Sequence, residues 1–252
     1  MVPRIIIFTQ KGNPALFDGY LKIKFEVFVE EMGWSGIPHD PMARRALPDH
    51  VDRESTFSAA LDENDVLIGV VRGTLPRRIV ELYRVERFAD VIAQDFVGFL
   101  EGRIATMNAL AVQSNHRHER FHPATTDVVV PQVRPHVAET LMRSTILELT
   151  AQGAEIILAS ALAGPSHALV RGLGFTDLGP ARGFGGAAYS LDPKAPEMQL
   201  FDVALVTRAF CEDEASDVPT EVGPEILSTI SQFRIYLSQL SAERDEKDRS
   251  NV

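Results

Sequence analysis

The sequence of 252 residues is poor in cysteine, in basic charge and in long hydrophobic runs, and each shortage excludes a class of protein. Its single cysteine, Cys211, allows neither an internal disulfide nor a cysteine zinc cluster, which favours a reducing compartment. With 25 basic and 35 acidic residues the formal net charge is −10. Because nucleic acid usually requires a basic surface, we do not expect it as a partner.

Long apolar stretches are also missing. None approaches the roughly 18 residues that a membrane-spanning helix requires, so we expect no membrane span. The apolar run Ile5–Phe8 is too short for the core of a signal peptide and is typical of a first strand. These shortages together favour a location in the cytoplasm.

What is present is a regular alternation of strand-like and helix-like segments. Helical spacing predicts an amphipathic helix over Leu16–Met32 that ends at Gly33. Two strand-like runs separated by a turn-forming cluster predict a β-hairpin. The order of elements argues for a mixed α/β sheet. The remaining expected elements are strands at Thr56–Leu61, Val66–Gly73, Met107–Val112, Ile156–Ala161 and Phe201–Val206, helices at His136–Gln152 and Pro165–Gly172, and a long surface loop at Ser35–Glu54.

The pattern weakens toward the C-terminus, and we expect two units, residues 1–192 and a C-terminal extension over residues 193–252. The extension begins with a possible strand and continues through an acidic linker at Glu212–Glu221. Apolar residues then recur at helical spacing over Glu225–Leu240, which predicts a docking or dimerising helix. Such a helix is suited to forming a homodimer, and the charged tail after it should be frayed.

Three stretches, in order, carry a pattern of charged and aromatic residues. Leu21–Trp34 has a basic residue, Lys24, followed by Phe28 and then Trp34. Ile68–Pro76 is strand-like and contains Arg72, and Met107–Val112 is followed five residues later by Arg117. Together they resemble the GNAT superfamily of N-acyltransferases, and more narrowly its branch of acyl-homoserine-lactone synthases and long-chain N-acyl amino acid synthases. The first stretch is similar to that branch's signature helix, the second to the strand whose arginine faces the cleft, and the third to the superfamily's entry to the phosphate turn.

The resemblance implies an α/β (α+β) GNAT fold, a mixed central sheet with splayed strands flanked by helices. It also implies that an acyl-thioester donor, acyl-CoA or acyl-phosphopantetheine, lies extended beside Met107–Val112. Free backbone groups of that strand would hydrogen-bond the donor and polarise its carbonyl, and the following turn would meet its phosphate. Candidate donor-binding residues are Leu110, Ala111, Val112, Arg117, Arg120, Ser160 and Ser166, although each serine could instead cap a helix.

The turn after the strand departs from the superfamily pattern. It contains no glycine over His118–His122, whereas turns that approach a pyrophosphate closely usually need one. By resemblance, an acyl carrier protein, which presents a single phosphate, becomes an attractive donor. Arg117, Arg120, Arg134 and Arg143 could form a basic patch for that acidic partner.

The acceptor side departs as well. Thr106 and Ala109 stand where the signal-synthase branch has a glutamate base and an arginine, and neither can do that chemistry. Asn108 is the candidate that would orient the amine, and Glu101 is a candidate remote base, with a solvated surface acid as the alternative. Candidate substrate-binding residues are Lys24, Phe28, Trp34 and Arg72, where the aromatic rings could instead belong to the core and a strand arginine must be paired, face a cleft or lie on a solvated face.

These features favour an N-acyltransferase that moves an acyl group from a thioester to the amine of a small molecule such as an amino acid. The alternatives are an acetyl-CoA-dependent N-acetyltransferase and a catalytically silent GNAT-like binding protein. The histidines at 116, 118 and 122 lack a neighbouring carboxylate at a recognised ligand spacing, so we expect no metal.

Overall fold

The computed structural model describes residues 4–34, 36–76, 103–117, 136–180 and 200–207. The strands in these ranges are β1 (Arg4–Thr9), β2 (His39–Asp40), β3 (Arg45–Ala46), β4 (Ser55–Leu61), β5 (Leu67–Thr74), β6 (Ile104–Val112), β7 (Ile156–Leu162), β8 (Thr176–Pro180) and β9 (Leu200–Val206). The helices are α1 (Pro14–Lys24), the π-helix η1 (Phe25–Glu31), α3 (Val137–Ala151), α4 (Pro165–Gly172) and two single 3₁₀ turns, η2 (Asp52–Glu54) and η5 (Ser114–His116).

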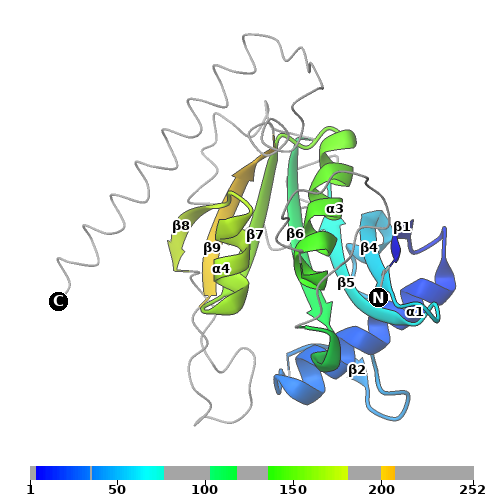
Figure 1. Cartoon of the computed structure of the whole chain (residues 1–252). Coiled ribbons are helices and arrows are strands. Elements are labelled where there is room, and N and C mark those ends of the chain that lie inside the picture. The colour runs from blue at the N-terminus through cyan, green and yellow to red at the C-terminus, as the bar shows by residue number, and fades with distance from the viewer. Residues whose placement is uncertain (1–3, 35, 77–102, 118–135, 181–199, 208–252) are drawn as a thin grey trace, which may run out of the picture.

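The main sheet has the order β1-β4-β5-β6-β7-β9-β8. Every neighbouring pair is antiparallel except β6 and β7, which are parallel and are joined through α3. Helices α3 and α4 cover one face of this sheet, and α1 and η1 pack on the other (Figure 1). The predicted mixed sheet flanked by helices is therefore confirmed.

Each face of the sheet has its own apolar core. Beneath α3 and α4 the core includes Leu141, Ile146 and Val170, and beneath α1 it includes Tyr20 and Phe57. The α3 side is packed closely, because a Cβ added to Gly73 on β5 would lie 2.8 Å from a methyl carbon of Thr145. Glycine is therefore required where the helix crosses the strand.

The predicted helix over Leu16–Met32 consists of two different helices. It begins earlier than predicted, because the Asn13 side chain accepts a hydrogen bond from the Leu16 amide at 3.1 Å and Pro14 occupies the first turn. At Phe25 the winding widens into η1, a π-helix that ends at Glu31. Such π segments are rare and frequently lie at functional sites.

The hairpin of β4 and β5 has the predicted turn. Asp62 accepts hydrogen bonds from the amides of Asn64 and Val66, at 2.9 and 2.8 Å, and Asp65 adopts a left-handed φ of 62°. Aspartate tolerates that conformation better than most residues, which explains why it occupies this position.

A bulge in β6 sets the shape of the sheet where the strands diverge. The register with β5 shifts between Val70 and Arg72, and Ala109 opposite them has a left-handed φ of 53°. A bulge bends its strand and increases its twist. Pairing with β7 ends at Met107, just before the bulge, and the two strands diverge toward one end of the sheet in Figure 1.

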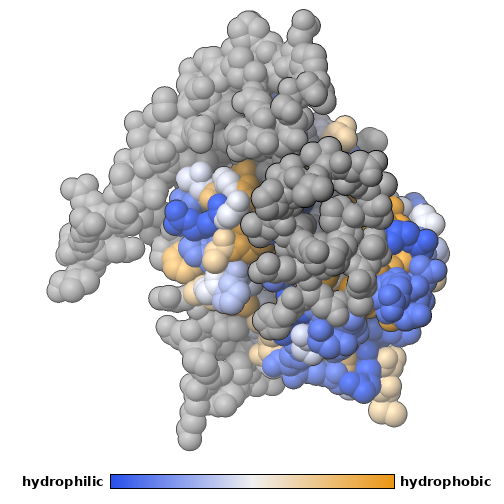
Figure 2. Space-filling model, in the orientation of Figure 1, coloured by the Kyte–Doolittle hydropathy of each residue, from blue (hydrophilic) through white to orange (hydrophobic). Residues whose placement is uncertain are grey.

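Strand β9 lies between β7 and β8, so the sheet includes residues from the segment that we expected to form the C-terminal extension. The predicted linker and helix at 212–240, and with them the proposed dimer contact, lie outside the described residues. Within the described part of the chain, no helix is both long and apolar enough to cross a membrane. The visible surface over α1 and the neighbouring edge of the sheet is mainly hydrophilic (Figure 2).

Candidate functional site

A cavity of about 300 Å³ lies where β6 and β7 diverge. Its polar end includes Lys24, Asp49, Arg72 and Asn108, and the rest of its wall is largely apolar. Side chains from both faces of the sheet line it, so it passes between the two strands. The apolar wall includes Phe28, Trp34, Val71, Met107, Leu110, Met142, Leu158, Ala159, Ala161, Leu162, Val170 and Leu200.

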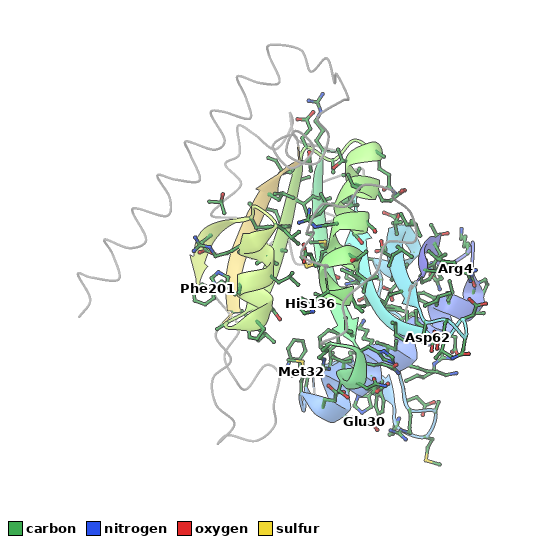
Figure 3. All side chains as sticks on the ribbon, viewed as in Figure 1. Arg4, Glu30, Met32, Asp62, His136 and Phe201 are labelled. Carbon is green, nitrogen blue, oxygen red and sulfur yellow. The ribbon has the colours of Figure 1, made fainter. Side chains whose placement is uncertain are left out.

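The divergence leaves one edge of β6 without a strand partner in the described part of the chain. Pairing with β7 runs from Ile104↔Ile156 to Met107↔Ala159 and stops there. From Asn108 to Val112, β6 pairs only with β5 on its other side. Because unpaired strand groups are strong hydrogen-bonding sites, this edge can hold an extended ligand. Figure 3 shows Met32 and His136 at the end toward which the strands open.

Arg72 is the centre of the polar end and is 1% exposed. One guanidinium nitrogen donates to Asp49 Oδ2 at 2.5 Å and to Asp52 Oδ1 at 2.6 Å, and Nε donates to Asn108 Oδ1 at 2.7 Å. The two aspartates are held in turn, because the Asp49 amide donates to Asp52 Oδ2 at 2.8 Å. A buried arginine with these contacts is a fixed group rather than a mobile one.

Lys24 lies beside this arginine on the last turn of α1. It is 8% exposed, and its Nζ is 3.5 Å from Asp49 Oδ2 and 5.4 Å from the centre of the Tyr20 ring. The Tyr20 hydroxyl is buried without a hydrogen-bond partner among the described residues. The Tyr20 ring is fully buried, with the Lys24 ammonium over it.

The ion pairs determine the protonation states of these groups. Burial disfavours the charged form of Asp49, but Arg72 and Lys24 outweigh it, and the pKa of Asp49 is lowered. Burial likewise disfavours the ammonium of Lys24, but Tyr20 and Asp49 outweigh it, and the pKa of Lys24 is raised. Burial opposes the charge of Arg72, yet Tyr20 and Asp49 raise its pKa as well. The polar end is therefore held charged and paired at neutral pH.

Two polar atoms in the cavity wall have no partner within the described ranges. They are the Oγ1 of Thr106 and the Nδ2 of Asn108, and both are buried. The Asn108 amide has a fixed orientation, because only its oxygen can accept from Arg72 Nε. Since an unpaired buried donor is costly, the cavity is suited to a polar ligand at this end.

Two aromatic rings form the wall nearest η1. Phe28 and Trp34 stack with ring centroids 4.9 Å apart and planes 21° from parallel, and both line the cavity. The Trp34 amide donates to the Phe28 carbonyl at 2.8 Å, which holds the chain against the end of the π-helix. Phe28 also belongs to the core beneath α1, so it serves both as core and as cavity wall.

The structure brings together most of the residues predicted from the sequence. Eight of them line the one cavity, namely Lys24, Phe28, Trp34, Arg72, Asn108, Leu110, Ser160 and Ser166.

Three others lie elsewhere. The side chains of Ala111 and Val112 are buried in the two cores. Arg117 donates from Nε to the Val112 carbonyl at 2.9 Å and forms an ion pair with Glu31. A phosphate at Arg117 would thus compete with a carboxylate. Glu101 and Arg120 lie outside the described residues.

Asp49 and Asp52 are the functional candidates that sequence reasoning missed. They lie in the segment interpreted as a long surface loop, which in fact contains β2, β3 and η2. The available signal was Arg72 itself, because a buried arginine on a strand requires carboxylate partners. The described residues contain no group of three or more potential ligands arranged to hold a metal ion.

The sequence matches no protein-family model, and no curated protein matches it significantly. Several solved structures are similar. One is BjaI, a CoA-dependent acyl-homoserine lactone synthase with SAM and isopentyl-CoA, at TM-score 0.53 and 13% identity over 88% of this chain and 94% of that one. A second is FeeM, an N-acyl amino acid synthase from uncultured soil microbes, at TM-score 0.51 and 16% identity over 84% and 98%.

A putative phosphinothricin N-acetyltransferase is also similar, at TM-score 0.51 and 13% identity over 81% of this chain and 99% of that one. These likenesses confirm the fold predicted from the three sequence stretches, that of the GNAT-type acyltransferases.

Proposed function

We propose that the protein is an N-acyltransferase that moves an acyl group from a thioester to the amine of a small molecule such as an amino acid. The observation that carries this proposal is the cavity at the divergence of β6 and β7. On one side it has a strand edge that no described strand pairs with, and on the other a paired polar cluster. A fold shared with acyltransferases supports it.

The strand edge is the donor side of the proposed reaction. Amide groups of a pantetheine arm can hydrogen-bond β6 beyond Met107, as an added strand would. The thioester carbonyl then lies near a backbone N–H of Leu110 or Val112, which stabilises the oxyanion as it forms. The acyl chain lies against apolar wall residues such as Met142 and Val170.

The transfer is a direct attack. The amine nitrogen forms a bond to the thioester carbonyl carbon, the tetrahedral intermediate collapses, and the carbon–sulfur bond breaks to release the thiol. The amine loses a proton and the sulfur gains one, so the step is balanced without a covalent enzyme intermediate. Holding both reactants at one cavity supplies much of the rate enhancement.

The donor is acyl-CoA or an acyl group on a carrier protein. Arg117 pairs with Glu31, and Arg143 pairs with Glu139, with Nε 3.0 Å from the carboxylate. These two arginines of the proposed patch for an acidic partner are therefore already partly neutralised. The patch alone does not distinguish a carrier protein from CoA, so both donors are to be compared directly.

The test is mass spectrometry of products formed by the purified protein from mixed acyl-thioesters and amino acids. A long-chain N-acyl product above the uncatalysed rate supports the proposal, and a product formed only with acetyl-CoA supports the N-acetyltransferase alternative. Ligand binding without any N-acyl product supports the silent binding protein and refutes the enzyme. Presenting each acyl chain both on CoA and on carrier protein identifies the donor.

A further inference from the structure

We infer that Asn108 is a specificity-determining residue that binds a carboxylate oxygen of the acceptor through its Nδ2, with Lys24 as the charged partner. The inference rests on the proposed function, because it concerns the acceptor of that reaction. It goes beyond the proposed function by naming the acceptor's carboxylate as the group that is recognised, and the Nδ2 of Asn108 and the Nζ of Lys24 as the atoms that bind it.

The first step is the fixed direction of the Asn108 amide. Its Oδ1 is 2.7 Å from Arg72 Nε, and the guanidinium of Arg72 is itself held by two carboxylates. Rotating the amide by half a turn would set two N–H donors against each other, so Nδ2 points away from Arg72. This donor is buried and has no partner among the residues described, while Asn108 lines the cavity. A bound ligand that supplies an oxygen there removes the cost of the unpaired donor.

The second step is the loose contact of Lys24. Asp49 Oδ2 is shared between Arg72 at 2.5 Å and Lys24 at 3.5 Å, so the arginine makes the tighter bond. An ammonium has three donors, and this long contact engages one of them. Lys24 Nζ can therefore turn toward a ligand without breaking the pairing of Arg72. An amide N–H and an ammonium at one end of a cavity together suit a carboxylate.

The charges at this end of the cavity also favour a ligand with one negative charge. Lys24 and Arg72 balance Asp49 and Asp52, so the four-residue cluster carries no net charge. An amino acid whose amine is in its neutral, reactive form brings one negative charge. Lys24 can meet that charge, while Asp49 remains paired with Arg72.

The position of Asn108 on β6 distinguishes the acceptor from the thioester. Asn108 is the Cα partner of Arg72, so both side chains project from the same face of the sheet, the face on which α1 carries Lys24. It is also the first residue beyond the last pair with β7, where the donor edge begins. Because the carboxylate and amine of an α-amino acid are attached to the same carbon, anchoring the carboxylate at Asn108 places the amine beside that edge.

The test compares each of the twenty common L-amino acids with its own carboxamide, first by calorimetric binding and then as acceptors for acyl transfer. The native protein should prefer the carboxylate. Asn108→Asp keeps the acceptor oxygen for Arg72 but replaces the Nδ2 donor by an oxygen. It should lower the affinity for the amino acid that the native protein binds best by roughly 10- to 100-fold. It should also reverse or abolish the preference for that amino acid over its carboxamide. The KM of the thioester should stay within about twofold.

Two further variants make the result decisive. Lys24→Gln should lower the affinity for the same amino acid and leave the affinity for its carboxamide nearly unchanged. This variant tests the inference again if Asn108→Asp does not fold. Asn64→Asp is the control, because it makes the same chemical change in an exposed turn. It should leave the preference for the amino acid over its carboxamide unchanged.

The inference is overturned if no amino acid binds, or if Asn108→Asp and Lys24→Gln lower kcat for both acceptor forms equally and leave the preference intact. Failure of the proposed function has a different signature, which is amino-acid binding that depends on Asn108 without formation of any N-acyl product.

Discussion

Removing the positive charge of Arg72 should be among the most damaging single changes in the described part of the chain. Arg72→Met retains most of the side chain's apolar volume but leaves Asp52, which is 0% exposed, without its cation. Breaking a buried ion pair by deleting one partner costs about 3–5 kcal/mol. For a chain of this size each kcal/mol lowers Tm by roughly 2–4 °C, so we expect a fall of roughly 6–20 °C.

The assays are thermal melting and urea denaturation at pH 7, both monitored through the fluorescence of Trp34, the only tryptophan in the chain. Trp34 lines the cavity, so its signal also reports on the site itself. Arg44→Met is the matched control, because Arg44 pairs with Glu30 at the surface with 70% of its side chain exposed. That exposed pair should be worth less than about 1 kcal/mol.

Adding Asp52→Asn to Arg72→Met tests the cause. If the buried carboxylate is what destabilises the single variant, the second substitution should recover part of the loss, and the two changes should be strongly non-additive. Losses that add to within about 0.5 kcal/mol, or a loss for Arg72→Met no larger than that of Arg44→Met, would refute the reasoning.

Three other predictions follow from particular contacts. Since the lowered pKa of Asp49 lies below its ordinary 3.8, its contribution to stability should be fully present above about pH 5 and lost as pH falls through the folded-state pKa, so acid titration of stability should be steeper for the native protein than for Asp49→Asn. Gly73→Ala should cost about 1–3 kcal/mol in urea denaturation, because the new Cβ would meet Thr145 at 2.8 Å, and an unchanged midpoint would contradict this packing. Met142→Ala removes side-chain volume from the apolar wall and enlarges the cavity, so the preferred acyl donors should become longer or bulkier. An unchanged profile of transfer rate against acyl-chain length would exclude Met142 from the acyl site.

The sequence carried enough information for the fold because the elements around the sheet have clear periods and boundaries. The hairpin turn and α4 occur where predicted, and Gly153, with a φ of 102°, ends α3 at the expected stop. The resemblance over Leu21–Trp34 singled out Lys24, Phe28 and Trp34, and all three line the one cavity, although Trp34 lies beyond the end of the helix.

The features that sequence reasoning missed depend on long-range contacts. The bulge in β6 relies on a left-handed alanine at 109, which local propensity does not predict. The π-helix that begins at Phe25 lies inside the segment whose spacing predicted one continuous helix. The ion pair between Arg117 and Glu31 joins residues 86 positions apart, so no local pattern shows that this arginine is already engaged.

A crystal structure with a non-hydrolysable acyl-pantetheine analogue tests the central claim most directly. The account predicts that the pantetheine arm lies between β6 and β7, hydrogen-bonded to β6 beyond Met107, with the acyl chain against the apolar wall. An analogue bound elsewhere on the protein, with the cavity between the two strands unfilled, would contradict it.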